Sequence, residues 1–169
     1  MSAVGVTPTA MTVFGLFVVV TGAVLIASGR LILGAAVVLA GSALDGLDGA
    51  VARASDRVTP RGALLDAAFD RLGEIAAFSG LAVALAGQAR VLLLIVLSVG
   101  GALLVPYMRA RAEAEGFSGR GGLMGRAERV ILFCGGLIFG LVEPMLWVFV
   151  TLVWITAAVR FVRTYRSIT

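Results

Sequence analysis

Residues 45–70 read DGLDGAVARASDRVTPRGALLDAAFD, a polar stretch in an apolar chain, in which four aspartates stand out: Asp45, Asp48, Asp66 and Asp70. At about 100° per residue, the first two fall on one face of a helix. The last two are four residues apart and share a face of the next helix. Because the link between the two helices is short, we expect them to be antiparallel neighbours. All four carboxylates can therefore converge at one depth.

The segments around this stretch are apolar enough for a membrane. Of the 169 residues, 60% are hydrophobic and 14% are charged, and the mean hydropathy is +1.04, whereas soluble domains carry about 25% charged residues. Backbone polar groups must be paired in lipid, so runs of about 20 apolar residues are expected to be helices. The sequence thus predicts an all-α, polytopic membrane protein with one domain over residues 1–169. Its six predicted transmembrane helices are residues 9–28, 31–52, 62–86, 90–112, 127–142 and 144–163.

The arginines indicate the topology. The chain has no lysine, and 12 of its 14 arginines lie in or beside the second link, the fourth link and the C-terminus. The positive-inside rule places these segments in the cytoplasm, and six spans then place the N-terminus there too. We interpret the net charge of +4 as orientation and anion binding, with no nucleic-acid partner. The lack of histidine excludes a histidine-based triad and argues against zinc chemistry, and the one cysteine, Cys134, cannot form an internal disulfide.

Four carboxylates at membrane depth need compensating charge. Each costs roughly 2.5–3.5 kcal/mol to insert, and they repel one another. Hard divalent cations with oxygen ligands are the natural partners, Mg²⁺ above all, with Mn²⁺ or Ca²⁺ as alternatives. A two-metal cluster would pair the carboxylates and clamp a phosphate or diphosphate. Gly49 and Gly62 leave room for a ligand near the backbone, and Arg53 can pair with a phosphate oxygen. The alternatives are interhelical salt bridges with neighbouring arginines, or a proton or ion path.

The same stretch resembles a family signature. It matches the pattern D-x₂-D-G-x₂-A-R-x₈-G-x₃-D-x₃-D of the CDP-alcohol phosphotransferases, also called CDP-alcohol phosphatidyltransferases, at all eight specified positions. The resemblance implies a six-helix, dimeric enzyme of the plasma membrane with its active site at the cytoplasmic face. Two ions, Mg²⁺ or Mn²⁺, would be held by Asp45, Asp48, Asp66 and Asp70. Asp70 would be the general base that activates an acceptor hydroxyl toward a CDP-linked lipid such as CDP-diacylglycerol, with release of CMP. The nucleotide would be contacted by Thr12, Asp45, Gly49, Ala52, Arg53 and Gly62.

A second stretch of sequence narrows the choice of acceptor alcohol. Residues 107–132, YMRARAEAEGFSGRGGLMGRAERVIL, resemble the corresponding part of phosphatidylinositol-phosphate synthases and archaetidylinositol-phosphate synthases. In those enzymes a basic pocket holds the phosphate of inositol 1-phosphate. Carried over, that pocket would use Arg109, Arg129 and Arg160, with Arg111 and Arg126 as weaker candidates. Arginine suits this role because it binds phosphate in a bidentate way and keeps its charge. Glu113 and Glu128 are expected to orient the arginines.

Other functions remain open at this point. The same chemistry could use glycerol 3-phosphate, serine or another alcohol, in which case the arginines are topology anchors or lipid head-group contacts. A small metal-binding transporter is an alternative of another class, although the sequence has no inverted repeat. Relatives in the family carry an amphipathic helix before the first span, and we expect none here, because only residues 1–6 precede Thr7-Pro8. Membrane lipids and a second copy of the chain are the expected partners.

Overall fold

The computed structural model describes residues 8–54, 59–119 and 121–168; side chains are described from residue 11 onward, except over 47–54. Over these residues the chain is all-helical, as predicted, with six α-helices. Their bounds are α1 Pro8–Ala27, α2 Leu31–Ala54, α3 Pro60–Ala84, α4 Ala89–Ala114, α5 Arg126–Ile138 and α6 Val142–Ser167. The prediction that no amphipathic helix precedes the first span concerns residues 1–6, which lie outside the described residues.

Prolines and one threonine set several helix starts. Thr59 precedes α3, and its hydroxyl oxygen accepts the N–H of Gly62 at 3.1 Å, which is the geometry of an N-cap. Pro60 follows as the first helical residue, where a missing N–H costs nothing. The predicted spans 127–142 and 144–163 imply a break at Glu143-Pro144. That break was wrong, because both residues lie in the first turn of α6, where proline is again tolerated. The break lies earlier, at Gly140, whose φ of +68° favours glycine.

Among the residues whose side chains are described, two helices are long and apolar enough to cross a membrane, namely α4 and α6. The described parts of α1 and α2, Met11–Ala27 and Leu31–Gly46, are apolar too. α5 has 13 residues and rises about 20 Å, less than the roughly 30 Å of a bilayer's hydrocarbon core. The six predicted transmembrane spans therefore stay a prediction.

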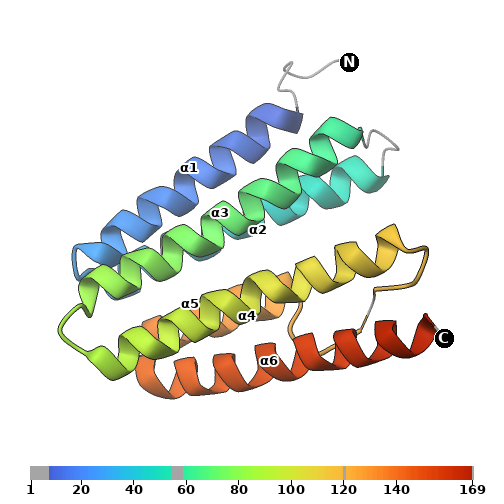
Figure 1. Cartoon of the computed structure of the whole chain (residues 1–169). Coiled ribbons are helices and arrows are strands. Elements are labelled where there is room, and N and C mark those ends of the chain that lie inside the picture. The colour runs from blue at the N-terminus through green and yellow to red at the C-terminus, as the bar shows by residue number, and fades with distance from the viewer. Residues whose placement is uncertain (1–7, 55–58, 120, 169) are drawn as a thin grey trace, which may run out of the picture. The chain divides into compact units, whose positions relative to one another are not determined.

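The chain divides into two compact units, Met1–Ala84 and Leu85–Thr169. In the first unit, α1 packs against both α2 and α3. Glycines allow the helices to approach closely: a β-carbon on Gly80 of α3 would collide with the carbonyl oxygen of Ala23 in α1. Figure 1 shows the start of α1, the end of α2 and the start of α3 at one end of this unit. Those are the ends that the arginine pattern predicts to be cytoplasmic.

In the second unit, α6 packs against α4 and α5. The side chains of Leu146, Phe149 and Val153 are fully buried along α6. The indole N–H of Trp154 donates to the carbonyl oxygen of Leu97 at 3.1 Å, and the absence of a side chain at Gly101 makes room for that ring. That residues 1–169 form a single domain stays a prediction.

Candidate active site

Three of the four predicted aspartates come together in the first unit. Carboxylate oxygens of Asp45, Asp66 and Asp70 all lie within 4.8 Å of one another. Asp45 comes from α2 and is buried, with 8% of its surface exposed, while Asp66 and Asp70 come from α3 and are partly exposed. The predicted convergence of the two helices is thus observed for these three. The side chain of Asp48 lies outside the described residues.

The packing of α1 positions the buried member of this acidic cluster. A β-carbon on Gly15 of α1 would lie 3.3 Å from the β-carbon of Asp45, so α1 runs directly past the site. Thr12, predicted to contact the nucleotide, lies about one turn earlier on α1 and is partly buried. On α3, Asp66 and Asp70 lie on consecutive turns and share one face.

The chemistry of the acidic cluster fits a divalent cation. All three donors are carboxylates, the ligand type that Mg²⁺ and Mn²⁺ prefer. Ligand oxygens in an octahedral Mg²⁺ shell are separated by at most about 4.2 Å, given bonds of about 2.1 Å. A small side-chain rearrangement from the observed spacing of up to 4.8 Å would therefore suffice. Arg71 lies beside the cluster, with 3.8 Å between one of its terminal nitrogens and Oδ2 of Asp70.

Several predicted nucleotide contacts fall where the structure says little about side chains. Gly49, Ala52 and Arg53 belong to the last turns of α2, but their side chains lie outside the described residues. Gly62 is described at the start of α3, one turn before Asp66, where its N–H is bound by Thr59. The roles predicted for these residues stay predictions.

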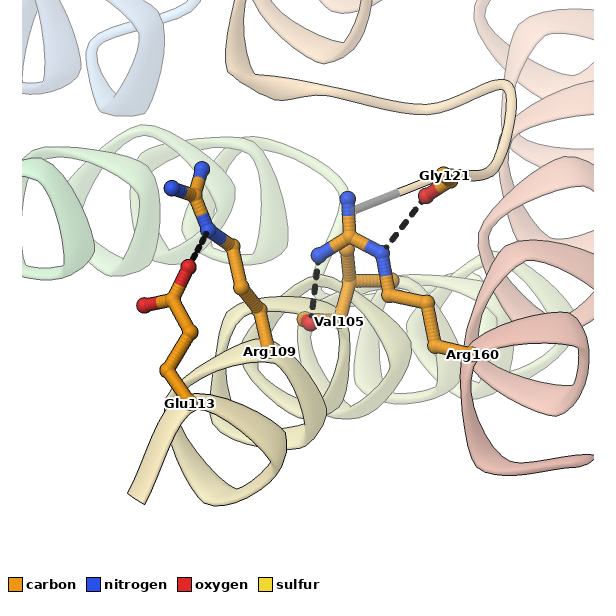
Figure 2. Close-up of polar contacts among 5 residues, drawn as sticks. All are labelled: Val105, Arg109, Glu113, Gly121 and Arg160. Carbon is orange, nitrogen blue, oxygen red and sulfur yellow. Dashed lines mark hydrogen bonds and ion pairs between the residues drawn. The ribbon is translucent and has the colours of Figure 1, made fainter. Parts of the chain in front are cut away.

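The three arginines predicted to bind the acceptor phosphate belong to the second unit. Arg160 of α6 donates from Nε to the carbonyl oxygen of Gly121 and from one terminal nitrogen to that of Val105, both at 2.8 Å. Figure 2 shows its guanidinium between these two carbonyl groups. Arg129 of α5 is buried, with 2% of its surface exposed, and donates to the carbonyl oxygen of Met124 at 3.1 Å. Arg109 and Arg129 are close enough to Arg160 for their positive charges to repel its guanidinium.

Arg109 is held within its own helix. Its Nε lies 2.8 Å from Oε1 of Glu113, one turn along α4 (Figure 2). The prediction that Glu113 orients an arginine is therefore confirmed. Arg111, the weaker candidate, pairs with Glu115 on an exposed face of the same helix. The structure thus places Arg111 apart from the buried contacts of Arg129 and Arg160.

The remaining candidates cluster at the start of α5. Arg126 is the first residue of that helix. Glu128 lies against Gly125, the residue that precedes the helix, since a β-carbon there would be 2.6 Å from its Oε2. An acidic side chain at this point is favourable because it faces the N-terminal end of the helix dipole. Its predicted role in orienting an arginine stays a prediction.

Sequence reasoning missed Thr156. This α6 residue is fully buried, and its hydroxyl oxygen accepts the backbone N–H groups of Leu123 and Met124, both at 3.2 Å. A single threonine in an apolar helix carries no signal of such a role, because threonine hydroxyls in helices usually bond within their own helix. The conformation of the facing residues was more predictable: Gly121 and Gly122 have φ of +122° and +96°, which favour glycine.

Known proteins of one family are similar to this chain. The family model described as CDP-alcohol phosphatidyltransferase matches residues 5–162. The phosphatidylinositol phosphate synthase of Mycobacterium marinum is 42% identical over 137 residues, which are 79% of this chain and 58% of that protein. The archaetidylinositol phosphate synthase of Methanothermobacter thermautotrophicus is 39% identical over 135 residues, which are 79% of this chain and 68% of that protein.

Solved structures of a third relative superpose on nearly the whole chain. Mycobacterium tuberculosis phosphatidylinositol phosphate synthase with CDP-DAG bound has a TM-score of 0.87 and 32% identity, over 95% of this chain and 87% of that one. The same enzyme in complex with manganese and citrate has a TM-score of 0.86 and 33% identity, over 95% and 83%.

Proposed function

The chain belongs to the CDP-alcohol phosphatidyltransferase family, and from this premise we propose that it transfers a phosphatidyl group from CDP-diacylglycerol to inositol 1-phosphate and releases CMP. The observation that carries the proposal is the meeting of Asp45, Asp66 and Asp70 on two neighbouring helices, within one family signature. The arginines of the second unit and the printed names of the relatives support an acceptor that bears a phosphate.

The reaction needs a base and an electrophile. Asp70 takes the proton from the acceptor hydroxyl, whose oxygen then forms a bond to the β-phosphorus of the CDP-lipid. The bond from that phosphorus to the bridging oxygen breaks, and CMP leaves with the electron pair.

The negative charge of the diphosphate must be offset. Asp45, Asp48, Asp66 and Asp70 would hold two divalent cations, Mg²⁺ or Mn²⁺, which when bound supply electrostatic stabilisation to the diphosphate and its leaving group. The solved relative with manganese supports a divalent metal in this family. Arg53 would contact a phosphate, and the nucleotide would rest against the remaining positions predicted for it. These are Thr12, Gly49, Ala52 and Gly62.

The acceptor phosphate would be held by Arg109, Arg129 and Arg160, with Arg111 at the margin. Arg160 uses two donors for backbone carbonyls, and a guanidinium has five N–H groups, so three remain for an anion.

We further propose six membrane crossings with both termini in the cytoplasm, a dimer, and a catalytic face toward the cytoplasm of the plasma membrane. The arginine distribution is what supports this orientation.

The test is CMP release from CDP-diacylglycerol by the purified chain with Mg²⁺. Four acceptors are compared: inositol 1-phosphate, glycerol 3-phosphate, serine and inositol. We expect release that depends on inositol 1-phosphate, is abolished by EDTA and by Asp70→Asn, and is retained by the exposed-surface control Glu115→Gln. Release with glycerol 3-phosphate alone would keep the reaction and overturn the acceptor. Bound metal with no CMP release from any acceptor would instead favour transport.

A further inference from the structure

The backbone turn Gly121–Met124 holds two of the three phosphate-binding arginines. Its first carbonyl, that of Gly121, accepts Nε of Arg160 at 2.8 Å. Its last carbonyl, that of Met124, accepts a terminal nitrogen of Arg129 at 3.1 Å. Each guanidinium is therefore oriented by a backbone atom of this one turn. A shift of the turn would move both side chains together.

The turn is itself held from α6 by Thr156. The N–H groups of Leu123 and Met124 both point to the Thr156 hydroxyl oxygen, at 3.2 Å each. The methyl group of the same side chain faces Gly122, where a β-carbon would collide with it. Thr156 and the side chain of Met124 are buried, with 0% and 2% of their surfaces exposed. Because a buried N–H group is costly to leave unbonded, the bond from the Met124 N–H to this hydroxyl fixes the turn against α6.

Thr156 and Arg160 are on the same face of α6, one turn apart. The Gly121–Met124 turn therefore contacts two successive turns of α6, through the Thr156 hydroxyl group and through the Arg160 guanidinium. Arg160 also bonds the carbonyl of Val105 at 2.8 Å, which ties the turn to α4 (Figure 2). The polar donors and acceptors of this region form one connected series from Thr156 to both arginines.

We propose that Thr156 is a positioning residue for the acceptor subsite: by binding the Gly121–Met124 turn, it sets Arg129 and Arg160 to receive the acceptor's phosphate. This inference rests on the proposed function for the identity of the acceptor. It predicts a specific kinetic pattern. Losing the hydroxyl loosens the turn and weakens binding of the phosphorylated acceptor, whereas the CDP-lipid, whose predicted contacts all lie in the first unit, binds as before.

The variants separate the hydroxyl from the shape of the side chain. Thr156→Val keeps the branched shape and removes the oxygen that accepts both N–H groups. Thr156→Ser keeps that oxygen and removes the methyl group. Thr151→Val is the matched control, because Thr151 lies on the same helix but is exposed and donates to the carbonyl of Trp147 at 2.9 Å. Gly122→Ala disturbs the same contact from the other side, through a β-carbon that would meet the Thr156 methyl group.

Two readouts are measured on the full chain in detergent micelles. The first is amide hydrogen exchange in peptides that cover residues 121–125, which needs no substrate. The second is KM for inositol 1-phosphate and for CDP-diacylglycerol, each at saturating co-substrate. For Thr156→Val and Gly122→Ala we expect faster exchange and about a tenfold rise in the acceptor KM alone, which corresponds to the loss of about one hydrogen bond. Thr156→Ser should stay within about threefold of the parent, and Thr151→Val should match it.

The outcomes distinguish this inference from the proposed function. Faster exchange with an unchanged acceptor KM, or an equal rise in both KM values, would overturn positioning and leave Thr156 a purely structural residue. Unchanged exchange in both Thr156→Val and Gly122→Ala would overturn the binding of the turn itself. If the parent chain releases CMP only with an acceptor that lacks a phosphate, the proposed function fails and the phosphate-positioning role fails with it. The exchange data would then still report whether Thr156 holds the turn.

Discussion

Gly22 of α1 and Gly34 of α2 face each other at backbone contact: a β-carbon built on Gly34 would lie 2.7 Å from the carbonyl oxygen of Gly22. The reverse distance, from a β-carbon on Gly22 to the carbonyl oxygen of Gly34, is 2.8 Å. Seven residues earlier in α1 and seven residues later in α2, Gly15 and Gly41 repeat the approach, at 3.2 Å between a β-carbon on Gly41 and the Gly15 carbonyl oxygen. This close packing places α1 beside Asp45.

Gly34→Ala is therefore expected to destabilise the first unit. The added methyl group must push α1 and α2 apart, and overpacking of this kind costs about 1–3 kcal/mol. Gly100→Ala is the matched control, because a β-carbon at that helical position meets nothing within 4 Å. Thermal unfolding in detergent, followed by circular dichroism, should show a lower midpoint for Gly34→Ala only. Equal midpoints for the two variants would contradict the close approach.

Neutralising one carboxylate of the acidic cluster should have opposite effects with and without metal. In the metal-free protein, Asp66→Asn removes repulsion among three carboxylates that lie within 4.8 Å, so its unfolding midpoint should rise. Saturating Mn²⁺, which at 100 times its Kd stabilises a protein by about 2.7 kcal/mol, should raise the midpoint of the parent and much less that of the variant. The measurement is the midpoint in EDTA and in Mn²⁺. Glu115→Gln, on the exposed end of α4, should follow the parent in both conditions.

The two tryptophans are expected to differ in their importance for stability. Trp154→Phe removes the hydrogen bond to the carbonyl of Leu97 and should cost about 1 kcal/mol. Trp147→Phe keeps an aromatic ring beside Arg90, whose guanidinium carbon lies 5.6 Å from the ring centroid, and should cost less than about 0.5 kcal/mol. Thermal unfolding of both variants provides the comparison. A larger loss for Trp147→Phe would refute the role given to the indole N–H.

Arg160→Lys should impair acceptor binding although the charge is kept. A lysine ammonium lacks the planar fork that spans the carbonyls of Val105 and Gly121. We expect KM for inositol 1-phosphate to rise about tenfold, the equivalent of about 1.4 kcal/mol, with KM for CDP-diacylglycerol unchanged. Arg166→Lys, near the end of the same helix and exposed, is the control. Full activity of Arg160→Lys would mean that charge alone is required.

The helical fold and the acidic cluster were predictable because their signals are local. Asp66 and Asp70 share a helix face by spacing alone, and a short link makes the meeting with Asp45 geometrically necessary. The break at Glu143-Pro144 was misplaced because proline is as well suited to a first helical turn as to a link. The length of α5 was overestimated, since apolar composition continues past Ile138 while Gly140 ends the helix.

The arginine site was predictable only in part. Arg109 and Glu113 lie one turn apart, so their pairing follows from the sequence. The contacts of Arg160 with Gly121 and Val105 span 39 and 55 residues, and no pattern in one sequence indicates which carbonyl a distant side chain will meet. Thr156 belongs to the same class, 32 residues from Met124. Backbone donors and acceptors carry no residue identity, which is why these contacts were missed.

The charged residues near the two ends of α4 and α6 define the length of the apolar stretch in each helix. At one end Arg90 pairs with Glu143, with 3.0 Å between the charged atoms, and at the other end each helix carries an arginine, Arg109 or Arg160. With a rise of 1.5 Å per residue, the apolar stretch between these charges is about 29 Å in α4 and about 26 Å in α6. Those lengths match a thin hydrocarbon layer. A thicker layer would have to become thinner around the helices, or the charged side chains would enter the hydrocarbon. We therefore expect the thickness of the surrounding lipid layer to influence Arg160 and the Gly121–Met124 turn to which it is bonded.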